Sequence, residues 1–379
     1  MHTSRDRILT THVGSLPRSK AVTDAVFAAE KGEPLADAAD IIRKAVDDVV
    51  AKQVATGIDV VSDGEMSKIS YATYIKDRIT GFEGDSERDP PSDLQAFPGF
   101  LERQAKSGGT PSYRRPCCVG DIAVKDMGPV QEDIANLNAA VEKHTPTEAF
   151  MNAASPGVIA LFQPNRHYPD HKSYLSALAD AMAPEYRAIV EAGIVLQLDS
   201  PDLGLGRHML FKDKSDEEYE RLAALHVEAL NHALDGLPKE RIRLHVCWGN
   251  YEGPHHHDAP MEMVLPIALR ANVGALLFES SNPRHAHEWQ VFAEADLPDD
   301  LVLVPGVPDS TTNFVEHPKL VAERIVRFAN IVGRERVIAG TDCGFSTFAG
   351  FGAVDEDIVY AKLASMAEGA AIASERLWG

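Results

Sequence analysis

The sequence predicts an α/β fold of the (β/α)8 TIM-barrel class, in which eight parallel strands form a ring that helices surround. Two observations lead to this prediction. Eight short apolar segments alternate with segments of helical periodicity, which is typical of a parallel sheet. Polar and metal-binding residue types follow these apolar segments repeatedly. In TIM barrels the catalytic residues lie at the carboxyl ends of the strands, so this regularity supports the fold class.

Length and composition favour one domain over residues 1–379. Of these residues 44% are hydrophobic, so the chain can bury a sizeable core. The formal net charge of −20 argues against nucleic acid and anionic membranes as partners, because basic surfaces bind phosphate groups. No apolar run approaches the roughly 20 residues of a membrane span, and no signal peptide is evident. Four cysteines are too few for a disulfide framework, so a cytoplasmic protein with reduced thiols is expected.

The expected strands are short apolar runs that end at a proline, a glycine or a polar residue. The first run ends before Pro17, and the second places Ile58, Val60 and Val61 in the core before the polar Asp63. In chain order, the eight expected strands comprise residues 8–15, 57–65, 145–156, 193–199, 241–247, 274–279, 301–306 and 336–341.

Helices are expected between these strands. Residues 172–192 carry apolar side chains at helical spacing. The helix over residues 215–234 has a polar beginning that suits an N-cap at Ser215 and an acidic first turn. The expected helices comprise residues 20–56, 172–192, 215–234, 260–271, 318–332 and 355–376.

Residues 78–116 are expected to form an irregular insertion, because Gly, Pro, Ser and charged residues are frequent there. A long irregular insertion in a compact domain is either a functional loop or a disordered one. Tyr113 and Arg114 lie at its far end. The apolar residues 117–122 that follow are interpreted as part of a hairpin over the mouth of the barrel.

A metal site is the central hypothesis. His245 and Cys247 are two apart on a predicted strand, so their side chains point to the same side. Cys343 follows another strand, and Glu279 ends a third. Nitrogen, sulfur and carboxylate ligands together fit Zn²⁺ best. Two alternatives remain: the His–Cys pair is buried without a metal, or Glu279 meets Arg284 or a histidine instead.

Glu65 and Asp199 form a candidate pair of carboxylates at two other strand ends. They are the candidate catalytic residues, either binding a substrate ammonium or taking part in acid–base chemistry. The alternative is a set of salt bridges to Arg18, Lys68 or Arg207. His255, His256 and His257 are consecutive in a Gly-Pro loop, so they are interpreted as loop residues near the mouth rather than as a metal cluster.

Seven short segments carry a resemblance to a known family. They are residues 10–17 (TTHVGSLP), 61–65 (VSDGE), 119–122 (VGDI), 196–201 (LQLDSP), 245–247 (HVC), 277–280 (LFES) and 341–344 (TDCG). Their order is the order seen in cobalamin-independent methionine synthase, and nearly the whole chain resembles the C-terminal catalytic barrel of that family. The resemblance implies Zn²⁺ at His245, Cys247, Glu279 and Cys343.

The resemblance also implies a set of substrate contacts. Ser15 would hold a homocysteine carboxylate through its loop, and Glu65 and Asp199 would hold the amine. His12, Tyr113 and Arg114 are further candidate contacts.

The chain also departs from the full-length family. The sequence predicts one barrel, whereas the full-length family has two. Asp199-Ser-Pro stands where the family has Asp-Glu-Pro. Single-barrel relatives include epoxyalkane:coenzyme M transferase and short methionine synthases thought to take methyl from a corrinoid protein. Three functions are therefore expected as alternatives: methyl transfer to homocysteine, alkylation of another thiol by an epoxide or other small electrophile, and a non-catalytic zinc-stabilised binding barrel. The expected partners are a small thiol and a small alkyl donor, with a homo-oligomer or a corrinoid protein as further alternatives.

Overall fold

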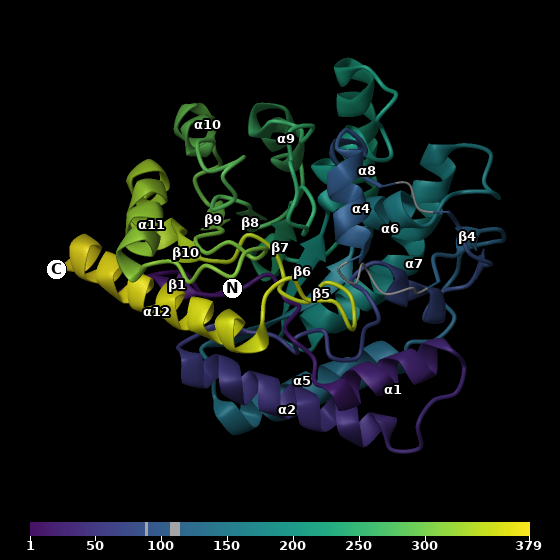
Figure 1. Cartoon of the computed structure of the whole chain (residues 1–379), viewed down its shortest axis with the longest axis horizontal. Helices are drawn as coiled ribbons and strands as arrows, with labels where there is room; N and C mark the ends of the chain where they lie inside the picture. The colour runs from purple at the N-terminus through teal and green to yellow at the C-terminus, as the bar shows by residue number, and fades with distance from the viewer. Residues whose placement is uncertain (88–89, 107–113) are drawn as a thin grey trace.

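The computed structural model describes residues 1–87, 90–106 and 114–379, and Figure 1 shows the chain as a whole. A curled parallel sheet lies at its centre. Six strands pair in the order β2, β5, β6, β7, β8, β9, each parallel to the next. Their bounds are β2 (Val60–Val61), β5 (Glu148–Ala154), β6 (Val195–Asp199), β7 (Ile242–His245), β8 (Ala275–Phe278) and β9 (Val302–Pro305).

Two further strands, β1 (Leu9–Thr10) and β10 (Ile338–Ala339), pair in parallel with each other. All eight strands lie within segments that the sequence predicts as strands, so the expected α/β class with a curled parallel sheet is confirmed. Isolated parallel bridges join β1 to β2 and β9 to β10: Thr11 to Val60, Leu303 to Val337 and Gly306 to Gly340.

Helices surround the strands, as Figure 1 shows. The apolar face that the sequence predicts for residues 172–192 is buried in α7. A large hydrophobic core fills the space between helices and sheet. The main helices are α1 (Lys20–Glu30), α2 (Ala38–Thr56), α5 (Gly128–His144), α6 (Pro156–Phe162), α7 (His171–Glu191), α8 (Asp216–Ala233), α9 (Met261–Ala268), α10 (Trp289–Glu294), α11 (Pro318–Val332) and α12 (Glu356–Trp378).

Three expectations about helices need correction. The single helix expected over residues 20–56 is two helices, because Gly32 adopts a left-handed φ of 79° and ends α1. The sequence predicts Pro156 only as the end of a strand, yet it also begins α6, where the side chain of Ser155 accepts a hydrogen bond from the Val158 amide. Helices α5 and α10 are not among the expected helices; Pro129 is the second residue of α5, where a missing backbone N–H is tolerated.

The insertion is more regular than the sequence suggests. Residues 78–116 contain helices α3 (Ser92–Gln95) and α4 (Pro98–Lys106), so the expectation of an irregular segment is wrong for this part. In place of the expected hairpin, the apolar segment forms an antiparallel pair with a distant strand: β3 (Phe82–Glu83) pairs with β4 (Cys117–Cys118), and α3 and α4 lie between them in the chain. Polar composition concealed α3 and α4, since short helices can be set by tertiary contacts rather than by their own periodicity.

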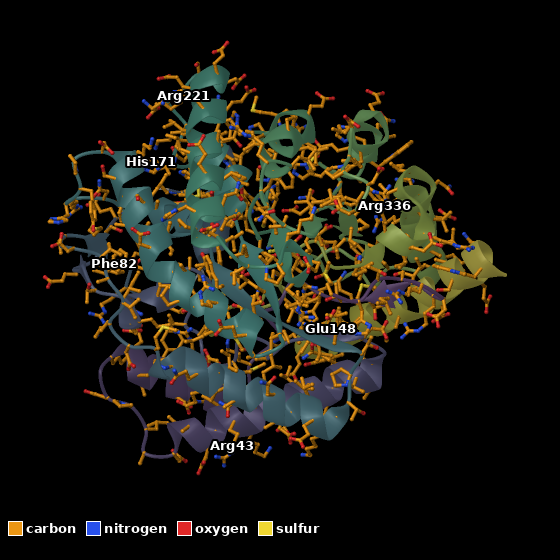
Figure 2. All side chains as sticks on the ribbon, turned by 180° about the vertical axis from the view of Figure 1, so that it is seen from behind. Arg43, Phe82, Glu148, His171, Arg221 and Arg336 are labelled. Atoms are coloured by element: carbon orange, nitrogen blue, oxygen red, sulfur yellow. The ribbon has the colours of Figure 1, made fainter. Side chains whose placement is uncertain are left out.

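Charged contacts stabilise the amino end of the sheet, where Figure 2 labels Glu148 at the start of β5. This carboxylate accepts hydrogen bonds from the Arg241 guanidinium at 2.9 Å and from the His2 amide at 2.8 Å. The opposite end of the sheet carries the candidate ligands, which is the usual division between stability and chemistry in such folds. None of the helices in the described parts of the chain combines the length and hydropathy of a membrane-spanning segment.

We expect Ser215→Ala to lower the free energy of unfolding by about 1 kcal/mol. The Ser215 side chain accepts from the Glu218 amide at 3.2 Å, and the Glu218 carboxylate accepts from the Ser215 amide at 3.3 Å, which is the expected N-cap in the form of a capping box. Urea unfolding measures the change. The exposed Glu220→Gln on the same helix is the control, and equal stability of both variants would contradict the capping role.

Candidate metal centre

Three of the expected metal ligands converge at the carboxyl ends of the strands. His245 ends β7, Cys247 follows it by two residues, and Cys343 follows β10. Their ligand atoms lie within 4.8 Å of one another, and the two sulfurs are 3.5 Å apart. All three side chains are buried. This convergence of one imidazole and two thiols is the arrangement that the sequence predicts for the core of a zinc site.

The orientation of His245 suits metal binding. Its Nδ1 lies 3.1 Å from the Asp199 carboxylate, while its Nε2 is buried and has no hydrogen-bond partner among the described residues. A carboxylate at one ring nitrogen is the usual support of a histidine that binds a metal through the other. Burial lowers the pKa of His245, but the hydrogen bond to Asp199 and the nearby Cys247 outweigh it and raise the pKa to about 10. The buried Nε2 therefore carries a proton that a metal ion could replace.

The two thiols are poor nucleophiles without a cation beside them. The neighbouring Cys343 and burial raise the pKa of Cys247 well above its ordinary value, and the charge of Glu279 adds to this. The pKa of Cys343 is also raised: its bond to Cys247 lowers it, but burial and Glu279 outweigh that bond. A bound cation reverses such shifts because thiolates coordinate it. The donor set thus fits a thiophilic divalent ion.

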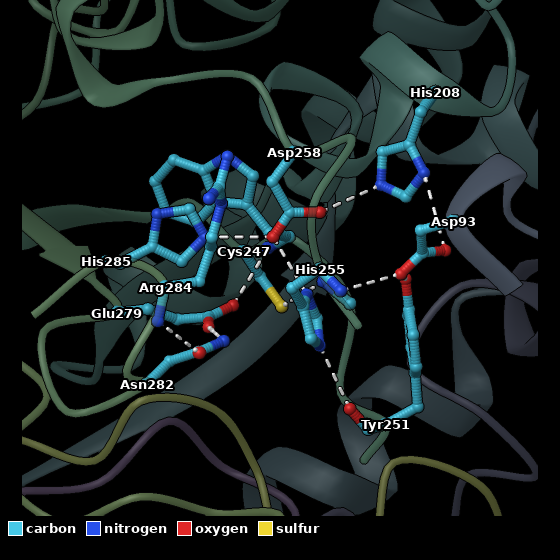
Figure 3. Close-up of polar contacts among 12 residues, drawn as sticks. Asp93, His208, Cys247, Tyr251, His255, Asp258, Glu279, Asn282, Arg284 and His285 are labelled. Atoms are coloured by element: carbon cyan, nitrogen blue, oxygen red, sulfur yellow. Dashed lines mark hydrogen bonds and ion pairs between the residues drawn. The ribbon is translucent and has the colours of Figure 1, made fainter. Parts of the chain in front are cut away.

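Glu279 lies close to the two thiols but does not join the three-ligand group. Its Oε1 accepts a hydrogen bond from the Trp248 amide and its Oε2 accepts one from the Asn282 side chain, both at 2.9 Å. Figure 3 shows the Glu279 carboxylate beside Cys247. The expected alternative was a salt bridge between Glu279 and Arg284. In the described part of the chain, the Glu279 carboxylate binds these two neutral donors instead. Its role as fourth ligand stays a prediction.

Asp342 fixes the loop that carries Glu279 relative to Cys343. Its Oδ1 accepts from the amides of Ser280 and Ser281, each at 2.8 Å, and its Oδ2 accepts from the Asn282 amide at 2.6 Å. Gly306 leaves room for this carboxylate, because a Cβ there would lie 2.1 Å from Asp342 Oδ1. One buried side chain thus joins two of the loops that carry candidate ligands.

Glu65 and Asp199 are close enough that the charge of Asp199 affects the pKa of Glu65. Burial raises the pKa of Glu65 to about 7; Lys68 opposes this, and Asp199 adds to it. Glu65 has a left-handed φ of 57°, and Arg18 donates to its backbone carbonyl. The Oε2 of Glu65 is buried without a hydrogen-bond partner among the described residues. An unpartnered buried carboxylate oxygen is a suitable acceptor for a substrate ammonium.

Asp199 has more partners than the sequence suggests. Besides His245, it accepts hydrogen bonds from Asn152 Nδ2 at 2.9 Å and from Gln197 Nε2 at 3.0 Å. The expected alternative of salt bridges is replaced by other contacts, since Lys68 donates to the Asn152 carbonyl and Arg207 pairs with Asp216. Asn152 and Gln197 are not among the site residues that the sequence predicts. Gln197 lies two residues before Asp199 on β6, and this shared face was an available signal, whereas the neighbours of Asn152 two residues away, Phe150 and Ala154, are apolar.

The remaining expected substrate contacts lie in different places. Ser15 is buried against the loop after Cys343, where its Oγ accepts from the Ser346 amide at 3.4 Å. Both ring nitrogens of His12 are engaged, one with Gln53 and one with the Gly14 amide. Ser15 therefore lies beside a ligand-bearing loop, as expected. His12 has both ring nitrogens bound to other protein groups.

The insertion residues form the last group of expected contacts. Arg114 is exposed and its guanidinium lies 3.6 Å from Glu30 on α1, so its observed partner is a carboxylate of that helix. Tyr113 lies outside the described residues. The role of both in substrate binding stays a prediction.

We expect Asp199→Asn to weaken metal binding roughly 10- to 100-fold, because the His245 ring loses the charged acceptor that orients it. Competition against a chromophoric chelator measures the affinity. Asp180→Asn is a matched control, since Asp180 forms a similar pair with His232 at 2.7 Å on the surface. Equal affinity in the two variants would contradict the supporting role of Asp199.

We expect Glu65→Gln to stabilise the protein at about pH 8 and to have little effect at about pH 5. Folding raises the pKa of this acid from 4.5 to about 7, so its ionisation costs stability, and the cost grows as the pH rises through that interval. The gain at the higher pH should be roughly 1–3 kcal/mol. Urea unfolding at both pH values measures it, and a gain independent of pH would contradict the burial of an ionisable Glu65.

Comparison with known proteins places this chain in a family. A model described as the catalytic domain of cobalamin-independent synthase matches residues 8–371. A methionine synthase of Saccharolobus solfataricus is 26% identical over 372 residues, which cover 97% of this chain and 95% of the relative. An uncharacterised protein of Bacillus subtilis, YxjH, is 26% identical over 93% of this chain and 91% of its own length.

A solved structure shares the fold. The structure of a B12-independent methionine synthase from Shewanella sp. W3-18-1, in complex with selenomethionine, aligns with a TM-score of 0.75 and 18% identity, over 98% of this chain and 99% of that one. The family match over nearly the whole chain confirms the resemblance seen in the sequence motifs and the expectation of a methyltransferase enzyme. This chain belongs to the cobalamin-independent synthase catalytic-domain family.

Proposed function

We propose that this protein transfers a methyl group to the sulfur of homocysteine with the help of Zn²⁺ and so forms methionine. The observation that carries the proposal is the buried convergence of His245, Cys247 and Cys343 at the carboxyl ends of the strands. Relatives of similar length that carry the name methionine synthase support the choice of reaction. The fourth ligand and the substrate contacts are those that the family resemblance implies, and the chemistry of the neighbouring residues supports them.

Four residues would hold the ion: His245, Cys247, Cys343 and Glu279. Glu279 would reach the ion after exchanging one of its two hydrogen bonds, which come from the Trp248 amide and the Asn282 side chain. Bound zinc lowers the pKa of a coordinated thiol, so that the substrate sulfur reacts as a thiolate at neutral pH. Asp199 keeps the proton of His245 on Nδ1 and leaves Nε2 for the ion. The substrate sulfur would then bond to the methyl carbon while the bond between that carbon and the donor breaks and leaves its electron pair on the donor.

The amino-acid part of the substrate thiol would be held by Glu65 and by the loop of Ser15. Glu65 offers a buried carboxylate oxygen without a partner in the described chain, and a substrate ammonium would satisfy it. The loop of Ser15, which packs on residues 344–346, would bind the substrate carboxylate. His12, Tyr113 and Arg114 complete the proposed set of substrate contacts, and His12 would exchange its hydrogen bond to Gln53 or to the Gly14 amide for one to the substrate. The free carboxylate oxygen of Glu65 favours homocysteine over a thiol that lacks an amine, such as coenzyme M.

We also infer that the sheet closes into a (β/α)8 barrel within one domain over residues 1–379. The pairing of β1 with β10 and the isolated bridges that flank this pair support closure, because they supply a parallel neighbour on each side. A closed ring has no free edge and directs all eight strand ends toward one mouth. Closure explains how ligands from β7 and from the loop after β10 meet.

We expect Cys343→Ser to lose bound zinc and to form no methionine from homocysteine, while its fold is retained. Wild-type protein purified without chelators should contain about one zinc per chain, as expected for one mononuclear site. Elemental analysis, circular dichroism and methionine formation with a methyl-donor panel measure these effects. Cys117→Ser is the matched control, since Cys117 is also buried but lies outside the ligand group.

Three outcomes would contradict the proposal in different ways. Absence of zinc from the wild-type protein would contradict the metal site. Full activity of Cys343→Ser would contradict the role of the metal in the reaction. Alkylation of coenzyme M but not homocysteine by the wild-type protein would replace the proposed substrate.

A further inference from the structure

A buried polar network lies beside the candidate metal centre and contains none of its ligands. We call it the Asp258 network, and Figure 3 shows most of its contacts. It contains three histidines and three carboxylates, most of them almost fully buried. The proposed reaction uses none of these side chains. The members are Asp93, His208, Tyr251, His255, Asp258, His285 and Glu288.

Asp258 is the centre of the network. Its Oδ2 lies 2.8 Å from His255 Nδ1 and 2.9 Å from His285 Nε2, and its Oδ1 lies 3.1 Å from His208 Nε2. The three histidines belong to the segments that follow β6, β7 and β8. A buried carboxylate is tolerated only where donors surround it. Asp258 therefore ties three neighbouring loops together at the carboxyl ends of the strands.

Asp93 brings the inserted segment into this network. It lies on the short helix α3, and it is fully buried. Its Oδ2 accepts hydrogen bonds from the Tyr251 hydroxyl at 2.8 Å and from the His255 amide at 3.0 Å, and its Oδ1 lies 3.8 Å from His208 Nδ1. A residue between β2 and β5 thus contacts the loop that follows Cys247.

The backbone of His255 adopts an uncommon conformation at this contact. It has a left-handed φ of 53°, which costs energy for any residue other than glycine. Its ring stacks on Tyr251 with centroids 4.6 Å apart, and its Nε2 lies 3.0 Å from the Tyr251 carbonyl. Burial lowers the pKa of His255, but Asp258 outweighs it and raises the pKa to about 9, so both ring nitrogens donate at neutral pH. Both the backbone amide and the side chain of His255 therefore hold this loop in place.

The network reaches the candidate ligands through Trp248. The His285 ring packs on the Trp248 indole with centroids 4.3 Å apart, and the indole donates to the Ala259 carbonyl at 2.7 Å. The Trp248 amide donates to Glu279, and Trp248 directly follows Cys247 in the chain. Movement of this buried indole would displace both Cys247 and the carboxylate of Glu279.

A second metal centre is the other explanation that a cluster of histidines and aspartates invites. Among the described residues, the only group whose ligand atoms converge as a metal requires is His245, Cys247 and Cys343. In the Asp258 network, the ring nitrogens face carboxylates and carbonyls instead of one common point. The geometry is that of a cross-link between loops.

We propose that Asp93 is a positioning residue for the metal centre: through Tyr251 and His255 it fixes residues 248–258 and so holds Cys247 and Glu279 in place. The inference rests on the proposed metal site. The inserted segment thereby has a specific role, because the buried carboxylate of Asp93 supports the loop that follows β7. Outer partners of metal ligands commonly contribute 10- to 100-fold to metal affinity.

We expect Asp93→Ala to bind Co²⁺ about tenfold more weakly than the wild-type protein and to change the absorption bands of the bound cobalt. Tyr251→Phe removes one of the two hydrogen bonds and should cause a smaller change in the same direction. Chelator competition measures the affinity, and the cobalt spectrum reports the ligand geometry independently of activity. Glu102→Gln is the matched control, since Glu102 is an exposed carboxylate of the same insertion.

The inference is overturned if Asp93→Ala and Tyr251→Phe fold and bind Co²⁺ with wild-type affinity and wild-type bands. If Asp93→Ala does not fold, Tyr251→Phe decides alone by the same two criteria. A wild-type protein that binds no Co²⁺ would overturn the proposed metal site itself, and the inference with it. A loss equal to that in Glu102→Gln would also overturn it, since that loss would have no relation to the network.

Discussion

The pairing register between β6 and β7 is the constraint on which the site depends. In this register Asp199 lies directly opposite His245, so the two side chains meet at the ends of adjacent strands. A slip by one residue would turn every side chain of the strand to the other face. The imidazole would then lose its carboxylate, and Cys247 would turn away from Cys343. The order of the sheet therefore sets the chemistry of the site.

The same register imposes a cost, because it buries charge inside the sheet. The layer below the site contains Arg243, which donates to Gln197 and lies over the ring of Phe150. Burial lowers the pKa of Arg243 to about 9, yet Glu148 and Asp199 favour its charged form. Gln197 in turn donates to Asp199. Gln197 and the His245 imidazole thus share Asp199 Oδ1, so this chain of polar contacts supports the carboxylate that faces the imidazole.

The sequence predicted the strands and the three converging ligands for one physical reason. Strand periodicity and strand ends are local properties, and parallel strands bring their carboxyl ends to one edge. His245, Cys247 and Cys343 could thus be placed together without knowledge of side-chain contacts. Asp199 was found as a site residue, but it was assigned to the substrate amine or to acid–base chemistry. Its bond to the imidazole depends on sheet register, which a single strand does not encode.

The features that the sequence did not reveal are those made by long-range contacts. Helix α3 has only four residues, so periodicity could not indicate it, and the burial of Asp93 depends on partners more than 100 residues away. Likewise, the run His255–His257 is interpreted from the sequence as a loop. That interpretation holds for the backbone, but His255 and its partner Asp258 are buried.

A polar insertion and a histidine-rich loop each have little local preference for one structure. The two segments pack together beside Cys247, because the buried polar groups of each segment form hydrogen bonds and ion pairs with those of the other. The carboxylates of Asp93 and Asp258 would be unfavourable in an apolar interior, and the histidines would lose charge there. Paired, they fix the loop that leaves β7. Two segments that appear irregular in the sequence therefore provide rigid support for the ordered site.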